Sequence, residues 1–362
     1  MASLVHVPAW VLKELNTLAF SFFWRGKRDL VSRAVVAQPT LFGGFSVVSV
    51  KFKVWSLVAQ WIKRFASSPS SWSALMTHWF RSHFNATPAD VFSRPYDFDP
   101  GVLPRFYESL ILAWRSLDGS FSAARSSLVM GSSSPHSLTP ATGTTTKSCY
   151  LYLLSENLRP PHCVTKFLPT FGVLYWSTTW RELFSFNTDR QVIDLSWKIA
   201  HGVLYTAARL ASFGYDFSTS CFCGPVSETL EHLFFYRPLA HNVLSWLQFL
   251  MFLSSPLAPS LVCRHTLFGF NSDELLAVPR IFVYMHNGCK FYIWHARNDF
   301  RFRDVRPGAA SVIENVKTRV RFHLPLHFKR LVSSRRRRYF HRQWGGRGVV
   351  ASVAGDRLLL HL

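Results

Sequence analysis

Acidic residues are scarce in this 362-residue sequence, with 20 Asp and Glu against 41 Lys and Arg and a formal net charge of +21. Asp273–Glu274 is the only adjoining acidic pair, so the sequence offers little material for an acidic divalent-metal site. The motifs G-x-x-x-x-G-K-[ST], G-x-S-x-G and H-E-x-x-H are absent as well. We therefore expect no enzymatic activity and no small-molecule substrate.

Long hydrophobic runs and a secretory signal are also lacking. Residues 242–262 are apolar on average, but Asn242, Gln248, four Ser and two Pro interrupt them. The N-terminus has no charged start followed by a long apolar run. The six cysteines are scattered, which argues against a disulfide framework and favours a reducing compartment. We expect no membrane span and a nuclear or cytoplasmic location.

Aromatic residues are abundant, with 33 Phe, 13 Trp and 11 Tyr, and the apolar positions mostly repeat with a helical period. The pattern predicts a mainly α fold: irregular helical domains with few short strands and a small zinc-knuckle-like turn. The expected helices cover 8–24, 45–65, 189–213 with a break at Gly202, 276–300 with an interruption or kink near Gly288, and 307–324. Residues 34–39 read as a short β-like run.

One stretch divides the chain. Residues 119–148 are rich in Ser, Thr, Gly and Pro and lack a clear period, which is typical of a linker. We expect a helical segment over 1–118 and a second helical domain over 149–328, which contains the cysteine segment 221–241. Residues 329–362 read as a basic C-terminal tail.

No acidic residue occurs between Asn315 and Gly355, and aromatic residues are interspersed among the basic ones there. The guanidinium of arginine donates paired hydrogen bonds to phosphates, and aromatic rings can stack on unpaired bases. The region therefore predicts nonspecific binding of RNA or DNA; a solvated tail, a nuclear localisation signal or an anionic membrane surface are the alternatives. The candidate contacts are Lys317, Arg319, Arg321, Lys329, Arg330, Arg335, Arg336, Arg337, Arg338, Tyr339, Arg342, Trp344 and Arg347.

The cysteine segment, CFCGPVSETLEHLFFYRPLAH, spaces Cys221, Cys223 and His232 like three ligands of a zinc site. Arg237 stands where a fourth ligand is expected, and a guanidinium has no lone pair to give. A water could fill that position, or His241 could reach it from one helical turn further along. The alternative interpretation is that the cysteines are small buried residues and that His232 serves packing.

The order of these elements resembles the zinc-binding region downstream of reverse transcriptase in LINE-type, non-LTR retrotransposon polyproteins. The matching positions are Cys221, Cys223, Glu228–Thr229, His232 and Arg237–Pro238, where the family has Cys-Pro at the last pair. The family more often spaces its first two cysteines C-x-x-C, which would place Ser220 first. Residues 15–47 resemble the segment after the polymerase thumb, and residues 195–214 resemble the Trp-x-x-x-His-Gly helix that precedes the zinc segment.

The resemblance implies a C-terminal portion of such a polyprotein, without the endonuclease and polymerase motifs. It implies a zinc cofactor, contact with template RNA or target DNA, and the polymerase part of a related polyprotein as a partner. A degenerate, inert remnant of a retroelement is an alternative, as is a basic protein with only a protein-interaction role.

Overall fold

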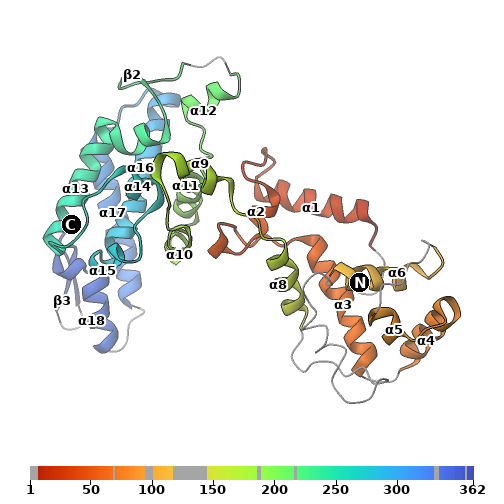
Figure 1. Cartoon of the computed structure of the whole chain (residues 1–362). Helices are drawn as coiled ribbons and strands as arrows, with labels where there is room; N and C mark the ends of the chain where they lie inside the picture. The colour runs from red at the N-terminus through yellow and green to blue at the C-terminus, as the bar shows by residue number, and fades with distance from the viewer. Residues whose placement is uncertain are drawn as a thin grey trace. The chain divides into compact units, whose positions relative to one another are not determined.

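The computed structural model describes residues 7–67, 70–93, 101–116, 145–185, 189–215, 218–329, 334–354 and 357–362 (Figure 1). Helices dominate these residues, and the strands form two short antiparallel hairpins. The mainly α fold expected from the sequence, with few short strands, is confirmed. Residues 119–144 of the expected linker and Arg330 lie outside the described residues.

The chain divides into two compact units. The first comprises residues 1–38 and 44–159, and the second comprises residues 39–43 and 160–362. The helices of the first unit are α1 (Ala9–Phe23), α2 (Arg33–Ala37), α3 (Val50–Ser67), α4 (Ser71–Phe84), α5 (Pro88–Ser93), α6 (Arg105–Ser116) and α8 (Thr146–Glu156).

An aromatic-rich core holds the first unit together. Met76, Phe80, Phe92 and Leu110 have almost no exposed surface, and the indole nitrogen of Trp114 donates to the carbonyl of Phe92 at 2.7 Å. Helix α8 packs against α3 through Leu153, so the contacts place it in the first unit. The division after Arg159 is therefore later than the expected start of the second domain at residue 149.

Residues 34–39 differ from the expected strand. Residues up to Ala37 form helix α2, because Val35 and Val36 are buried there and packing overrides their β propensity. The chain then turns back so closely that a Cβ at Gly44 would lie 2.0 Å from the Gln38 carbonyl oxygen. Gly44 therefore admits a backbone approach that no other residue would allow.

The second unit carries all candidate site residues. Its elements are η1 (Thr40–Phe42), α9 (His162–Phe171), α10 (Trp176–Ser185), α11 (Arg190–Ala200), α12 (Ala207–Ser212), β1 (Ser220–Cys221), β2 (Gly224–Ser227), η2 (His232–Tyr236), α13 (Pro238–Ser254), α14 (Cys263–Phe268), α15 (Glu274–Ala277), α16 (Arg280–Arg303), α17 (Ala309–Lys329), α18 (Ser334–Gln343), η3 (Gly346–Gly348), β3 (Ala351–Ala354) and β4 (Arg357–Leu360).

Helices α13, α16 and α17 pack against one another and form the core of this unit (Figure 1). Val312, Val316 and Val320 recur every four residues on one face of α17, and all three are buried, as their spacing predicts. Helix α16 is continuous through Gly288, so the helix is not interrupted there. Gly288 instead lies against α17, where an added Cβ would be 3.8 Å from Val316.

Most of the described residues in the expected basic tail are folded into the second unit. Phe340 of α18 is fully buried and its ring centroid lies 5.2 Å from that of Phe328. Val350 and Ala351 are buried as well, and strands β3 and β4 pair in register from Ala351–Leu360 to Ala354–Arg357. The apolar side chains among the arginines thus anchor this region, which corrects the expectation of a tail.

Candidate metal centre and nucleic-acid surface

A tight hairpin presents the two cysteines. Strands β1 and β2 are antiparallel, and Cys221 lies opposite Gly224 in the register. Gly224 has a φ of +152°, a conformation that favours glycine. Cys221 is buried and Cys223, at the turn, is exposed.

His232 joins the cysteines from the next element. It begins the single turn of π-helix η2, and its backbone N–H donates to the side-chain oxygen of Thr229 at 3.2 Å. The Nε2 atom of His232 lies 3.0 Å from the Sγ atom of Cys223. The ligand atoms of Cys221, Cys223 and His232 all lie within 4.8 Å of one another, so this group could hold a metal ion.

The donor set fits zinc in its chemistry. Thiolate and imidazole are the usual ligands of structural zinc, at about 2.3 Å for sulfur and about 2.0 Å for nitrogen. A tetrahedron of those bond lengths separates sulfur from nitrogen by about 3.5 Å. The Cys223–His232 pair, at 3.0 Å, lies close to that separation.

Arg237 is buried beside this group, with 4% of its surface exposed. Its guanidinium carbon lies 3.7 Å from the ring centroid of Phe222, and its Nη1 atom has no hydrogen-bond partner among the described residues. Burial, followed by the positive charge of Arg237, lowers the pKa of His232. Burial raises the pKa of Cys221 to about 11, and the charge of Arg237 opposes that rise. A metal cation bound by Cys221, Cys223 and His232 would be repelled by the positive charge of Arg237.

His241 does not belong to the three-residue group. It is exposed on helix α13, one turn beyond Arg237, and its backbone N–H donates to the Arg237 carbonyl at 2.9 Å. The expectation that His241 supplies the fourth ligand is therefore not met in this arrangement. A water molecule is the remaining candidate for that position.

The structure reveals one important residue that sequence reasoning missed. Arg297 of α16 forms an ion pair with Glu228 at 2.6 Å, and both side chains are almost completely buried. The Glu228 carboxylate also accepts from the backbone N–H of Ala207 at 2.9 Å. Glu228 thus ties the base of the hairpin to α12 and α16. The Glu-Thr pair before His232 was a signal for this role, because Glu228 anchors the segment and Thr229 caps its helical turn.

The Trp-x-x-x-His-Gly segment, residues 197–202, also contributes to packing. The side chains of Trp197 and His201 both contact the Gly43 carbonyl oxygen, with nitrogen–oxygen distances of 2.8 and 2.9 Å. Cys163 is a buried neighbour of His201, with its sulfur 3.8 Å from the Nδ1 atom of the imidazole. Burial lowers the pKa of His201 to about 4 and raises that of Cys163 to about 12. Both groups are therefore neutral near pH 7, and the pair lacks the ionisation of an activated nucleophile.

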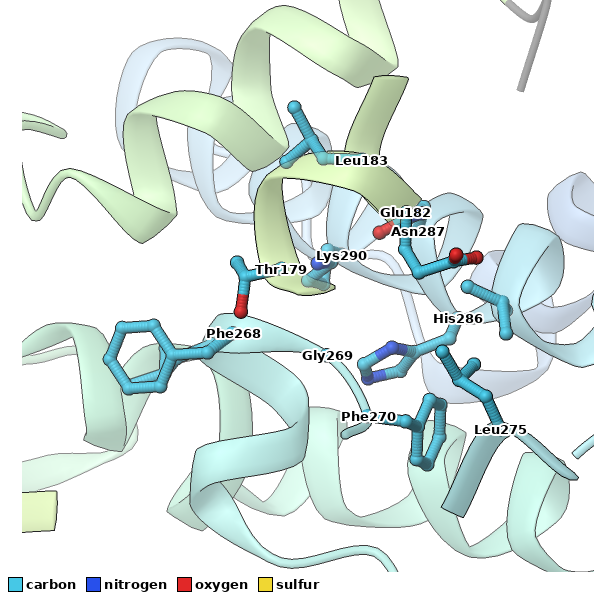
Figure 2. A pocket seen from close by; sticks show the side chains of 12 residues that line it. Thr179, Glu182, Leu183, Phe268, Gly269, Phe270, Leu275, His286, Asn287 and Lys290 are labelled. Carbon is cyan, nitrogen blue, oxygen red and sulfur yellow. The ribbon is translucent and has the colours of Figure 1, made fainter. Parts of the chain in front are cut away.

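A small cavity with both polar and apolar lining residues lies in the same unit (Figure 2). Thr179, His286 and Lys290 are among its lining residues, and burial lowers the pKa of Lys290 to about 7. The cavity has a volume of about 20 Å³. That volume accommodates about one water molecule, so the cavity is too small for an organic substrate.

The predicted nucleic-acid contacts separate into exposed and packed residues. Lys329, Arg336, Arg338, Tyr339, Arg342 and Arg347 are exposed. Arg338 and Arg342 lie one turn apart on α18. In the described parts of the chain Arg338, Arg342 and Arg347 form no ion pair with an acidic group. Arg335 belongs to α18, but its side chain lies outside what the structure describes.

Two predicted contacts are corrected by their packing. Arg319 is 8% exposed and forms an ion pair with Asp189 at 3.3 Å, because it projects from the packed face of α17. Trp344 is half-buried and stacks on His327, with ring centroids 4.5 Å apart. Neither side chain presents a free surface to a nucleic acid.

The remaining predicted contact residues are partly buried or already interact with other groups of the protein. Lys317 is half-buried, with its ammonium 6.0 Å from the ring centroid of Trp246, and Arg337 is also half-buried. Arg321 pairs with Glu314 and donates to the Leu362 carbonyl at 2.7 Å. The available part of the predicted surface is therefore centred on α18.

Comparisons with models of known protein families and with curated proteins found no match to this chain. Within the described ranges, none of the helices combines the length and the apolar character needed to cross a membrane.

Proposed function

We propose that this chain is a non-catalytic nucleic-acid-binding protein that contacts the phosphates of RNA or DNA without sequence specificity. The observation that carries the proposal is the exposed basic face of α18 and the following turn, with Arg338, Arg342 and Arg347. A formal net charge of +21 supports it, because such a field attracts polyanions. The packing of the second unit leaves only the exposed basic side chains free to contact a phosphate.

The resemblance to LINE-type polyproteins supports a more specific origin for this activity. We propose that the chain corresponds to the region after the polymerase, where template RNA or target DNA is held. The shared positions include Glu228, Thr229 and His232. Their roles as ion-pair partner, cap and candidate ligand agree with a segment built to fix one local shape.

Zinc is the metal that we propose for the cysteine segment, with Cys221, Cys223 and His232 as its ligands. Bound zinc would crosslink the hairpin to the turn that carries His232. The hairpin is already held by the buried pair of Glu228 and Arg297. We therefore expect the local fold to persist without metal, which separates nucleic-acid binding from metal loading.

Salt dependence tests the proposal. We expect the purified chain to bind duplex DNA with an affinity that falls steeply as salt rises, because each phosphate contact releases counterions. Replacing Arg338, Arg342 and Arg347 by Ser should weaken binding. It should also make the slope of log K against log salt shallower by about 0.9 for each phosphate that the variant no longer neutralises.

A matched control removes the same charge elsewhere. Lys13, Arg81 and Arg105 are exposed in the first unit, and the triple Ser variant at these positions should keep the slope of the wild-type protein. Equal weakening in both triple variants would show that only net charge matters. Absence of salt-dependent binding by the wild-type chain would refute nucleic-acid binding altogether.

A further inference from the structure

An open groove lies beside the cysteine hairpin, at the C-terminal end of α16. Its volume is about 730 Å³, and all its lining residues belong to the second unit. The lining residues are Ser220, Cys221, Phe222, Phe300, Arg301, Phe302, Arg303 and Asp304. The sequence-based candidate contacts include none of these arginines or phenylalanines.

The groove has an aromatic component of ordered geometry. The rings of Phe222 and Phe300 lie 4.1 Å apart between centroids. The guanidinium of Arg237 lies over Phe222 at 3.7 Å, and that of Arg306 lies over Phe300 at 4.7 Å. Each ring of this pair therefore contacts a guanidinium as well as the other ring. Phe302, by contrast, is 75% exposed, so a large ring is available at the groove.

Positive charge accompanies these rings. Arg301 approaches the Glu228 carboxylate at 3.7 Å, but Arg297 already binds that carboxylate at 2.6 Å. Two arginines therefore share one buried negative charge, which leaves excess positive charge behind the groove wall. Burial, followed by the charge of Arg297, lowers the pKa of Arg301, as expected for such crowding.

Two further arginines are available to a ligand. Arg303 is 76% exposed in its side chain and pairs with Asp299 at 3.1 Å. An exposed pair of this kind contributes little and can be exchanged for a phosphate. Arg306 is exposed and makes no ion pair with an acid in the described part of the chain. Asp304 is the one acidic residue that lines the groove.

We propose that this groove binds unpaired nucleotides of a single-stranded nucleic acid, with a base stacked on Phe302 and phosphates held by Arg303 and Arg306. An exposed ring beside arginines suits this ligand, because bases offer a stacking face only when they are unpaired. Excess positive charge complements the phosphodiester backbone. The inference rests on the nucleic-acid binding proposed above, and it names the form of ligand and a second contact site.

The experiment measures fluorescence anisotropy of three labelled probes with the full chain: a 12-nucleotide oligo(dT), a 12-nucleotide oligo(U) and a 12-base-pair duplex. Phe302→Ala should weaken binding of the single strands about 5- to 150-fold, the range that corresponds to loss of one stacked base. Binding of the duplex should stay within about twofold, because α18 contacts it through phosphates. Phe302→Trp should retain single-strand affinity, since it keeps the stacking face.

The control variant is Phe322→Ala, which removes another exposed phenylalanine, 66% exposed on α17. It should leave all three affinities unchanged. The double variant Arg303→Ser/Arg306→Ser should weaken single-strand binding and reduce its salt slope by about 0.7 for each phosphate that is no longer neutralised. If the Arg303→Ser/Arg306→Ser variant loses affinity for only one of the two single-stranded probes, oligo(dT) or oligo(U), that result would identify the type of strand that the groove binds and would support the site.

The outcomes separate this inference from the broader proposal. If wild-type protein binds no probe, nucleic-acid binding itself fails. If the duplex binds normally and Phe302→Ala leaves single-strand affinity unchanged, the groove is not a nucleotide site, and an exposed ring there would suit a protein partner. Equal weakening of duplex and single strands by Phe302→Ala would also overturn the inference.

Discussion

Replacing Arg237 by Cys tests the candidate metal centre directly. The side chain lies at the start of α13, stacked on Phe222 and close enough to Cys221 and Cys223 for their charges to interact. Nη1 of Arg237 has no hydrogen-bond partner in the described chain, so the substitution breaks no hydrogen bond at that atom. It removes a buried positive charge and adds a thiol next to a three-ligand group.

The expected gain can be estimated from the ligand count. Structural zinc contributes about 10–16 kcal/mol from four ligands, or about 3 kcal/mol for each ligand. The added thiolate should therefore tighten zinc binding at least about 100-fold. Arg237→Ser is the matched control, because it removes the same charge without supplying a strong ligand. Comparing Arg237→Cys with Arg237→Ser isolates the contribution of the fourth ligand from that of the charge.

Competitive titration against a chromogenic zinc chelator measures these affinities, and metal analysis of the purified proteins measures the stoichiometry. We expect one zinc per chain in Arg237→Cys, with weaker binding in Arg237→Ser and the weakest in the wild-type protein. Equal affinities of the Cys and Ser variants would refute the argument that position 237 faces the fourth coordination position. His241→Ala should leave the wild-type affinity unchanged, since His241 is outside the group.

Three further predictions concern the second unit. Glu228→Gln should lower the free energy of unfolding in a urea titration by about 3–5 kcal/mol, because it leaves Arg297 buried without its counter-charge. In the same urea titration, Glu314→Gln, which breaks the exposed ion pair with Arg321, should cost less than about 1 kcal/mol. Burial lowers the pKa of His201 to about 4 in the folded unit. Between about pH 6.5 and pH 4, His201 is therefore protonated in the unfolded chain but neutral in the folded unit. His201 therefore destabilises the fold as pH falls through that window, by up to about 1.4 kcal/mol per pH unit, and His201→Gln should remove this contribution from urea titrations at a series of pH values. Val316→Ala should cost about 2 kcal/mol in thermal unfolding, whereas Val305→Ala, at an exposed site, should stay within about 0.5 kcal/mol.

Periodicity predicted the helices well where one face carries the apolar residues. Val312, Val316 and Val320 show why, since their spacing alone places them on one side and the core takes that side. Reasoning from β propensity failed at residues 34–39, where buried contacts of Val35 and Val36 hold a β-favouring sequence in a helix. Local propensity is weak compared with the free energy of burying a side chain.

The candidate metal group was predictable because its ligands lie within twelve residues. A short hairpin and one helical turn bring Cys221, Cys223 and His232 together without help from distant segments. The partner of Glu228 was not predictable, because Arg297 is 69 residues away and resembles any other arginine in a basic sequence. The groove at Phe302 escaped prediction for the same reason, since it joins the hairpin to the end of α16.

The sequence by itself determined the excess of positive charge, the helical fold and the local spacing of three metal-type ligands, because each depends on composition or on near neighbours. Only the tertiary structure decided which basic residues face solvent. Arg319 and Arg338 carry the same side chain, yet one is buried against Asp189 and the other is exposed on α18. The difference lies in which face of each helix the core covers, and that is fixed by long-range packing.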